Sequence, residues 1–251
     1  MLASKRILEP EIMESLEEVY AYDKLTNQYL GILHNGFVET IINKSASEGN
    51  FLEVGSGTGR ISLGIAKYTN DIELTGIDLS DNMIHVARHN CNKMQLESKV
   101  SFKKGSATEI PFEDNSFDTV LSHNMLHHLP DPIQMIVEMK RVVKKSGGIF
   151  IRDLIRQPPL LLPLHVHILG IRYNALMKKE YSDSIKAALS KNEWKQLFEN
   201  SNIDNAIITN SFITHQSIEK EALNKRSDYI KVPTPFHLKP IKNMYVSKLK
   251  T

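Results

Sequence analysis

The decapeptide FLEVGSGTGR, residues 51–60, places a short apolar run and an acid before three closely spaced glycines. Such a run, followed by glycines and a helical pattern, predicts a strand, a tight turn and a helix, with backbone that can approach a ligand closely. A dinucleotide fingerprint G-x-G-x-x-G would need glycine at positions 55, 57 and 60, and position 60 is Arg60. The stretch therefore predicts a ligand-binding turn and argues against an NAD-dependent dehydrogenase.

Strand-like and helical segments alternate along the following part of the chain. Short apolar runs occur at 51–54, 73–77, 100–103, 117–121 and 148–154, with helical spacing between them. Strands that alternate with helices need crossover connections, which produce a parallel sheet covered on both faces. Two further strand-like runs within 206–218, separated by residues 209–211, predict a hairpin at the sheet edge. We expect a doubly wound, mostly parallel, seven-stranded α/β sheet.

Two of the helices have recognisable starts. Asp131 followed by Pro132 predicts an N-cap with proline in the first turn, and Ser190 with Glu193 predicts a capping box. The expected core-facing residues are Ile133, Ile136, Val137 and Val142 in the first helix and Trp194, Leu197 and Phe198 in the second.

The expected organisation is a single domain over 1–219 followed by a basic extension over 220–251. Within the domain we expect an N-terminal helical cap (1–48), a ligand-binding core (49–154), a lid or substrate insertion (155–189), and a C-terminal helix with the edge hairpin (190–219). The extension holds eight Lys/Arg against two acids, whereas the whole chain has a net charge of +2. It is either a solvated terminus or a docking arm for an anionic partner.

Composition and cysteine count exclude several classes of protein. With 41% hydrophobic and 24% charged residues, the chain has the balance of a globular protein. Its single cysteine, Cys91, excludes an internal disulfide framework and a cysteine-rich zinc site. Residues 1–20 are not expected to be a signal peptide, and the apolar run at 159–170 is about half the ~20 residues of a membrane-spanning helix. We expect a cytoplasmic protein without a transmembrane segment.

Asp78 is the second landmark after the glycine turn. It directly follows the strand-like run 73–77. In a doubly wound sheet, ligands bind at the carboxyl ends of the strands, near the topological switch point. A carboxylate at that place can accept hydrogen bonds from both hydroxyls of a ribose.

These features resemble one known family, the class I S-adenosylmethionine-dependent methyltransferases. The resemblance is carried by Glu53 with the glycines at 55, 57 and 59, GIDLS (76–80), GSATEIPF (105–112) and LSHNMLHHLPD (121–131). It covers roughly residues 49–155 and is closest to the subgroup that methylates quinones and other small molecules. It implies a Rossmann-like methyltransferase fold, a cofactor-binding core at 49–154, S-adenosyl-L-methionine as cofactor and S-adenosyl-L-homocysteine as product.

The resemblance also implies the cofactor contacts. Glu53 would help to orient the methionine moiety, and Asp78 would bind the ribose hydroxyls. The other implied contacts are Tyr22 and Tyr29 from the N-terminal helices, Gly55, Ser56, Gly57 and Gly59 in the turn, Leu79, Met83, Ser106 and Ala107 around the adenine, and His123 beside the transferable methyl group.

Methyl transfer from a sulfonium is an in-line displacement with a good leaving group, so alignment and desolvation can supply much of the acceleration. A general base is needed only when the acceptor must lose a proton. The catalytic candidates are His123, His128 and Asp153, which follow or end predicted strands. The pair His127–His128 is expected to be a structural turn of the family, and no metal site is predicted.

The insertion after residue 154 is expected to form the acceptor pocket, as insertions at this place do in similar enzymes. Its apolar residues and two histidines, His165 and His167, could line that pocket. Arg152 and Arg156 leave the sheet on its ligand side, where they could bind an anionic or polar acceptor. Alternatively, they form ion pairs that secure the insertion.

The leading hypothesis is an enzyme that transfers a methyl group from S-adenosylmethionine to a small, partly apolar acceptor. One alternative is an RNA or protein methyltransferase that docks its substrate with the basic extension, although scattered aromatic residues there argue against a nucleic-acid stacking platform. The other is a noncatalytic cofactor-binding partner subunit. A small-molecule acceptor is the expected partner, nucleic acid is not expected, and an oligomer is left open.

Overall fold

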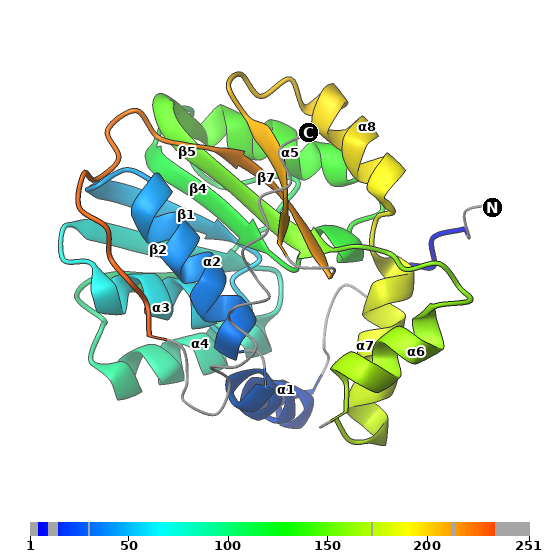
Figure 1. Ribbon diagram of the computed structural model, residues 1–251. Helices are drawn as coiled ribbons and strands as arrows, with labels where there is room; N and C mark the ends of the chain where they lie inside the picture. Colours follow the sequence, from blue (N-terminus) through cyan, green and yellow to red (C-terminus); the bar gives the residue numbers. More distant parts are fainter. Residues whose placement is uncertain (1–4, 10–14, 30, 172, 212–213, 234–251) are drawn as a thin grey trace.

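A seven-stranded sheet forms the centre of the protein (Figure 1). The computed structural model describes residues 5–9, 15–29, 31–171, 173–211 and 214–233. Within them the strands are β1 (Gly49–Val54), β2 (Ile72–Asp78), β3 (Val100–Lys104), β4 (Phe117–His123), β5 (Val143–Leu154), β6 (Ile207–Ser211) and β7 (His215–Lys220). Their order across the sheet is β3-β2-β1-β4-β5-β7-β6.

Five strands, β3 to β5 in that order, pair in parallel, and β7 and β6 add an antiparallel edge. The chain winds outward from β1 to β3 and then returns to β4, so the switch point lies between β1 and β4. The prediction of a doubly wound, mostly parallel, seven-stranded α/β sheet is confirmed. Ligands are expected at this switch point.

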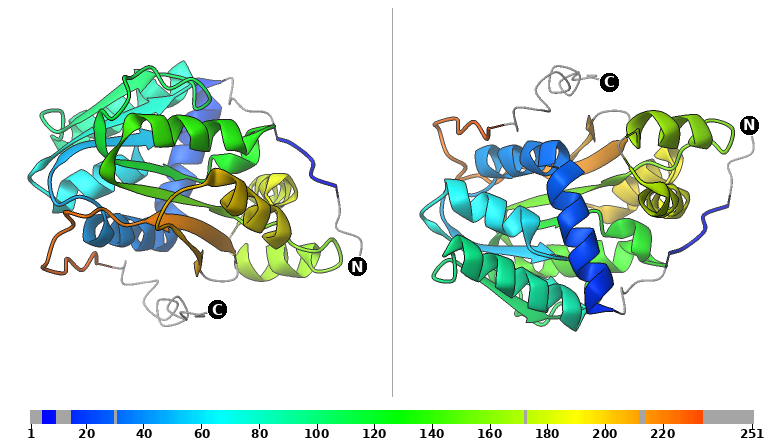
Figure 2. Two further views of the ribbon diagram at one scale, coloured as in Figure 1. Left: turned by 90° about the horizontal axis from the view of Figure 1, so that it is seen from above. Right: turned by 90° about the horizontal axis from the view of Figure 1, so that it is seen from below.

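Helices cover both faces of the sheet. The helices are α1 (Leu16–Tyr29), α2 (Gly31–Lys44), α3 (Arg60–Tyr68), α4 (Asp81–Met94), the 3₁₀ turn η1 (Leu126–His128), α5 (Pro132–Val142), α6 (Leu162–Leu169), α7 (Ala175–Ala187) and α8 (Lys191–Ser201). Buried side chains of α2, α3 and α4 form one core with Phe51, and those of α5 and α8 form the other with Leu52. Figure 2 shows α2 and α5 on opposite sides of the sheet.

The alternation of Phe51 and Leu52 between the two cores follows from the two-residue period of a strand. Both side chains are fully buried, as expected for a parallel sheet covered on both faces. Helices α1, α6 and α7 lie together at one end of the sheet (Figure 1).

The predicted helix starts are confirmed. The Asp131 side chain accepts a hydrogen bond from the backbone N–H of Ile133, and Pro132 occupies the first turn of α5. Ser190 and Glu193 form the full capping box of α8. Both features satisfy backbone N–H groups that have no partner inside the helix.

Two local predictions are wrong. Residues 209–211, expected to be the hairpin turn, are part of β6, and β7 begins only at His215. Val137, expected in the core stripe of α5, is 51% exposed, and the buried face instead contains Met135 and Met139. The apolar positions at 133, 136 and 137 fit two adjacent helix faces, and the packing of α5 on the sheet selects one of them.

Part of the basic extension packs against the body of the protein. The backbone N–H of Ala222 donates to the carbonyl of Lys44, and Asn43 exchanges two hydrogen bonds with the backbone of Ile230. Ala222 and Val232 are buried in the core that α2 helps to form. Residues 234–251 lie outside the described part of the chain. Among the described residues, no helix combines the length and apolarity that crossing a membrane requires.

Truncation to alanine should lower the stability of the protein strongly at Met139 and hardly at all at Val137. Met139→Ala should lower the free energy of unfolding by about 2–5 kcal/mol because it leaves a cavity in a closed core. Val137→Ala, on the same helix, should change it by less than about 0.5 kcal/mol because the side chain faces solvent. Urea unfolding followed by circular dichroism measures both, and equal losses would contradict this orientation of α5.

Candidate cofactor and acceptor site

The turn after β1 is folded over the end of β2. The backbone N–H groups of Gly55 and Ser56 both donate to the carbonyl of Ile77, each at 2.9 Å. Gly57 has φ +50°, a left-handed conformation, and a Cβ added there would meet no heavy atom within 4 Å. A glycine at position 57 therefore keeps the backbone open to a ligand on the exposed side of the turn.

Gly59 serves a different purpose at the start of α3. Its φ is +82°, and a Cβ there would lie 2.6 Å from the ring of Phe102. The missing side chain lets α3 and β3 pack closely. The third glycine of the motif is thus a packing residue, and Arg60 is the first residue of α3.

The carboxylate of Asp78 connects the turns after β1 and β2. Its Oδ2 accepts from the backbone N–H of Gly57 at 2.8 Å, and its Oδ1 accepts from that of Ser80 at 2.9 Å. Asp78 is half-buried. It therefore lies next to the open face of Gly57, where a ribose would reach its remaining lone pairs.

Glu53 is buried below the turn, with only 2% of its surface exposed. Its Oε2 accepts from the backbone N–H of Ser62 at 3.0 Å and also from the Ser62 hydroxyl. Burial raises the pKa of Glu53 to about 8, although both hydrogen bonds oppose the rise. The implied contact of Glu53 with a methionine moiety stays a prediction.

The other implied adenine contacts cluster at the ends of β2 and β3. Leu79, Met83 and Ser106 are half-buried, and Ala107 is buried. The Ser106 hydroxyl lies 3.0 Å from that of Thr108 and accepts from its backbone N–H. An adenine between these residues would find an apolar surface with one hydroxyl at its edge.

His123 ends β4 and lies beside two other histidines, the buried His215 and the half-buried His34. Its ring lies 5.4 Å from that of His34 in α2 and stacks on that of His215 in β7, with ring centroids 6.0 Å apart. Burial lowers the pKa of His34 to about 4 and that of His215 to about 3, and it lowers the pKa of His123 well below its ordinary value. All three imidazoles are therefore neutral at pH 7. Sequence analysis missed His34 and His215 because each is a single histidine in an otherwise ordinary helix or strand pattern.

The N-terminal helix is fastened to the glycine turn through Arg60. Its guanidinium binds Asp23 in α1 with two contacts, at 3.0 and 2.5 Å. Tyr22, next to Asp23, has its pKa raised to about 12 by burial and by the nearby carboxylate of Asp78. The implied contact of Tyr22 with the cofactor stays a prediction. The side chain of Tyr29 lies outside the described residues.

The arginines at the end of β5 are both engaged. Arg156 pairs with Glu193 at 2.8 Å and donates to the carbonyl of Ala188, so it ties α8 and the end of the insertion to the sheet. Arg152 donates to Ser217 at 2.9 Å, and its guanidinium lies over the ring of Phe37. Arg152 also pairs with Glu219 in β7 at 3.8 Å, so both arginines make ion pairs, Arg156 with α8 and Arg152 with the edge strand.

Asp153 is bound to His127. Its Oδ1 lies 2.6 Å from His127 Nδ1, and its Oδ2 accepts from the backbone N–H of the same residue. Burial alone would raise the pKa of Asp153, but the charge and hydrogen bond of His127 lower it. In α6, His165 contacts the hydroxyl of Tyr181 at 3.1 Å and His167 is exposed.

Several buried polar atoms at this end of the sheet have no hydrogen-bond partner among the described residues, including Ser56 Oγ, His123 Nε2 and Asn124 Oδ1 at the ends of β1 and β4 and His215 Nε2 in β7. Buried polar groups are nearly always satisfied, so such atoms mark a place where a polar ligand binds. The residues present fit a nucleoside cofactor with a polar amino-acid end. Asn124 is a further candidate that sequence analysis missed.

The fold and site define a nucleoside-binding α/β protein whose glycine turn and ribose-binding acid lie at the switch point. The family model for the methyltransferase domain matches residues 45–202. The chain therefore belongs to the methyltransferase-domain family, and the predicted membership of the class I S-adenosylmethionine-dependent methyltransferases is confirmed, as is S-adenosyl-L-methionine as the cofactor of this class.

The chain is also similar to individual proteins that are named as methyltransferases. The chain is 36% identical over 112 residues to phosphatidylethanolamine N-methyltransferase of Cereibacter sphaeroides, covering 45% of this chain and 54% of that protein. It is 32% identical over 166 residues to demethylmenaquinone methyltransferase of Staphylococcus aureus, covering 61% and 67%. The chain spans about half the length of several curated relatives that it matches.

Solved structures confirm the fold. The structure of a putative S-adenosyl-L-methionine-dependent methyltransferase from Methanococcus maripaludis matches with a TM-score of 0.66 and 20% identity. The match covers 88% of this chain and all of the other chain.

Glu53 should make the stability of the ligand-free protein depend on pH. The pKa of Glu53 is about 8 in the folded protein and about 4.3 in an unfolded chain. At pH values between these two, Glu53 is protonated in the folded state and ionised in the unfolded state. The contribution of Glu53 to stability is therefore complete below about pH 4.3 and is lost as pH rises through about 8. Glu53→Gln keeps the acceptor for Ser62 and removes the titration.

Urea unfolding of the wild type and of Glu53→Gln at several pH values from 5 to 9 measures this effect. The free energy of unfolding of the wild type should fall relative to that of the variant as pH rises. A difference that stays constant across the series would show that Glu53 is ionised in the folded protein throughout.

Proposed function

We propose that this protein transfers a methyl group from S-adenosylmethionine to a small, partly apolar acceptor. The observation that carries the proposal is the arrangement of Asp78 beside the open backbone of Gly57, at the switch point of a fold of this family. The ribose would bind Asp78, and the methionine end would pass over the glycine turn toward His123. When bound, the cofactor supplies an electrophilic methyl group on sulfur.

The neutral surroundings suit this chemistry. A sulfonium carries positive charge that disperses as the methyl group leaves, so the residues near it need to exclude water and align the acceptor. The three neutral histidines and the ring of Phe37, 4.9 Å from that of His123, exclude water there, and the buried guanidinium of Arg152, over the ring of Phe37, is the charge nearest to that ring among the contacts described. We propose His123 as the residue beside the transferable methyl.

His128 is the proposed contact to an acceptor that must lose a proton. Its side chain is 28% exposed, whereas those of His127 and Asp153 are 5% and 2% exposed. Asp153 holds the ring of His127 and acts through it, so it is a positioning residue. Arg152, His165 and His167 stay candidates for acceptor binding, and Arg156 has a securing role in the insertion.

Helix α6 supports an acceptor with apolar parts. Leu161, Leu164 and Ile168 recur at helical spacing and are 51%, 57% and 55% exposed. A helix that presents its apolar stripe to solvent marks a place where an apolar partner binds. Two relatives are named for phosphatidylethanolamine and demethylmenaquinone, both of which combine a polar reacting group with apolar chains.

Asp78→Ala should weaken binding of S-adenosylhomocysteine at least about 100-fold, measured by isothermal titration calorimetry. The variant loses two charge-assisted hydrogen bonds to the ribose, each worth about 1.5–3 kcal/mol. Asp78→Asn keeps one acceptor oxygen, so its affinity for S-adenosylhomocysteine should lie between that of Asp78→Ala and that of the wild type. Asp81→Ala is the matched control because Asp81 is an exposed acid three residues away, and its affinity should equal that of the wild type.

If the folded wild type does not bind S-adenosylhomocysteine, the proposed function is wrong. If Asp78→Ala binds as tightly as the wild type while keeping its melting temperature, the ribose contact is wrong and the cofactor lies elsewhere. Because Asp78 also holds the turns after β1 and β2, the melting temperature of each variant is measured alongside.

Leu164→Ser/Ile168→Ser should raise the KM for an apolar acceptor roughly tenfold or more, since burial of one such side chain is worth about 1.5–3 kcal/mol. The KM for S-adenosylmethionine should not change. Transfer of labelled methyl to prenylated quinols and long-chain amines, with RNA and protein in parallel, provides the assay. Leu223→Ser is the control because Leu223 is 84% exposed away from α6. Methylation of RNA or protein alone would overturn the small-acceptor proposal.

A further inference from the structure

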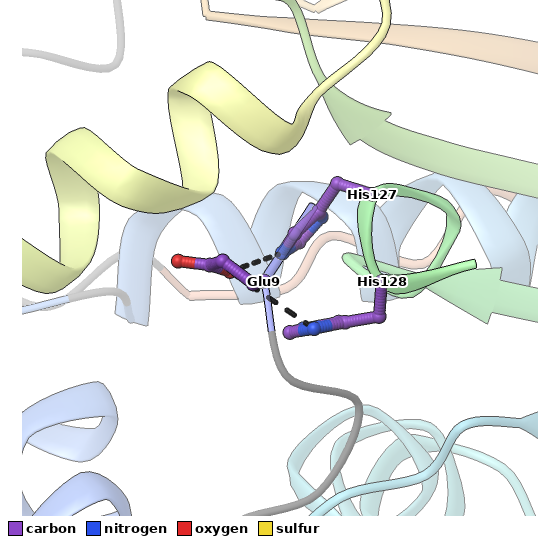
Figure 3. Close-up of side chains that lie close together, drawn as sticks. All are labelled: Glu9, His127 and His128. Carbon is purple, nitrogen blue, oxygen red and sulfur yellow. Dashed lines mark ion pairs between the residues drawn. The ribbon is translucent and has the colours of Figure 1, made fainter. Parts of the chain in front are cut away.

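The N-terminal segment brings a carboxylate to the two histidines of η1. The Oε2 atom of Glu9 lies 3.7 Å from His127 Nε2 and 3.9 Å from His128 Nδ1. One ligand atom from each of the three residues falls within 4.8 Å of the other two. Figure 3 shows the two rings directed toward the Glu9 carboxylate from the loop after β4. Glu9 is 118 positions from His127 in the sequence, so the sequence predicted no metal site here.

Contacts outside the three residues hold Glu9 in this place. Arg6 donates to the carbonyls of Leu126 and His127 at 3.0 and 2.9 Å, and also to that of Ala187. The Ser184 hydroxyl donates to both carboxylate oxygens of Glu9. The segment is thus fixed to η1 on one side and to α7 on the other, which keeps the carboxylate facing the histidines.

Asp153 sets the orientation of the His127 ring. It contacts Nδ1 at 2.6 Å and accepts from the backbone N–H of the same residue, so Nε2 is the atom that faces Glu9. A carboxylate that accepts from one imidazole nitrogen while the other faces an ion is the usual outer arrangement of metal-binding histidines, and it fixes the tautomer needed for ligation.

The donor set selects a transition-metal ion. Two imidazole nitrogens and one carboxylate oxygen suit Zn²⁺, whereas Mg²⁺ and Ca²⁺ prefer oxygen ligands alone. Bonds of about 2.0–2.1 Å in a tetrahedral site put ligand atoms about 3.3 Å apart. The two contacts of Glu9, at 3.7 and 3.9 Å, are a few tenths of an ångström longer, and all three ligand atoms lie within 4.8 Å of one another, so side-chain rotations would have to draw the three groups together around an ion.

The charges around Glu9, His127 and His128 and the access of solvent to Glu9 are compatible with a bound cation. Glu9 and Asp153 contribute two negative charges near the site, and the guanidinium of Arg6 is directed to backbone carbonyls. A surface hollow of about 400 Å³ is lined by Glu9 and by residues of α7, among them two acids, Glu180 and Asp183, and two lysines, Lys179 and Lys186, that pair with Asp183. An ion can therefore reach the carboxylate from solvent.

We propose that Glu9, His127 and His128 form a site for a single Zn²⁺ ion, with Asp153 orienting His127. Three protein ligands leave one coordination position open, as in catalytic rather than structural zinc sites. The ion would lie in the loop that follows His123, where it could polarise a heteroatom of the acceptor. His128 Nδ1 is then a ligand, and the ion takes over the task of making the acceptor lose its proton. The alternative is an ion-pair network that only fastens the N-terminal segment.

Direct metal titration tests the proposal without relying on methyl transfer, so its outcome is separate from that of the proposed function. The full-length chain is dialysed against a chelator and titrated with Co²⁺, whose visible absorption reports low coordination number, and bound Co²⁺ is then displaced by Zn²⁺. We expect one ion per chain. Glu9→Gln and His128→Asn should each weaken binding by at least about 100-fold, because each removes a direct ligand, whereas Asp153→Asn should weaken it about 10–100-fold.

The matched control is His85→Ala/His89→Ala. These two exposed histidines of α4 are spaced one helical turn apart and could bind an ion by themselves, so their removal should leave the affinity unchanged. Circular dichroism and melting temperature show whether each variant is folded. If one of the two ligand variants does not fold, the other is sufficient for the test. Absence of saturable binding by the wild type, or binding that survives both ligand variants and disappears in the control, would overturn the proposal.

Discussion

The carboxylate of Asp78 holds the two turns on which the site depends. It accepts from the backbone N–H of Gly57 and from that of Ser80, so the turns after β1 and β2 share one anchor. Because Gly57 has a left-handed φ, the turn exposes backbone where other residues would place a side chain. Arg60 extends this arrangement by binding Asp23, which brings α1 over the same end of the sheet.

Burial then decides the charge of the site. Glu53 has its pKa raised and His123, His34 and His215 have theirs lowered, in each case mainly because burial disfavours the charged form. The histidines near the switch point are therefore neutral, the buried guanidinium of Arg152 lies beside them over the ring of Phe37, and Asp78 stays at the half-buried edge of this region. A cationic cofactor would meet one carboxylate at the ribose and neutral imidazoles near its sulfur.

The N-terminal segment and the insertion are coupled through a few polar contacts. Arg6 binds carbonyls on both η1 and α7, and Arg156 joins the end of the insertion to α8 through Glu193. Each guanidinium connects segments more than thirty positions apart in the sequence. The proposed acceptor side of the site would thus be assembled from the chain before the sheet and the chain after β5, whereas the proposed cofactor side lies on the loops of β1 to β4.

The sequence by itself determined the doubly wound, mostly parallel sheet, the family, and the places of Gly57, Asp78 and the helix caps, because these depend on periodicity and on spacings within one βαβ unit. It could not select the buried face of α5, where Val137 and Met139 are both apolar and only packing on the sheet separates them. Tertiary structure alone decided the partners of Asp153 and Arg60, the grouping of His123 with His34 and His215, and the approach of Glu9 to the histidines of η1. Those contacts join residues from different elements, and their energies depend on burial and distance, which local sequence patterns do not encode.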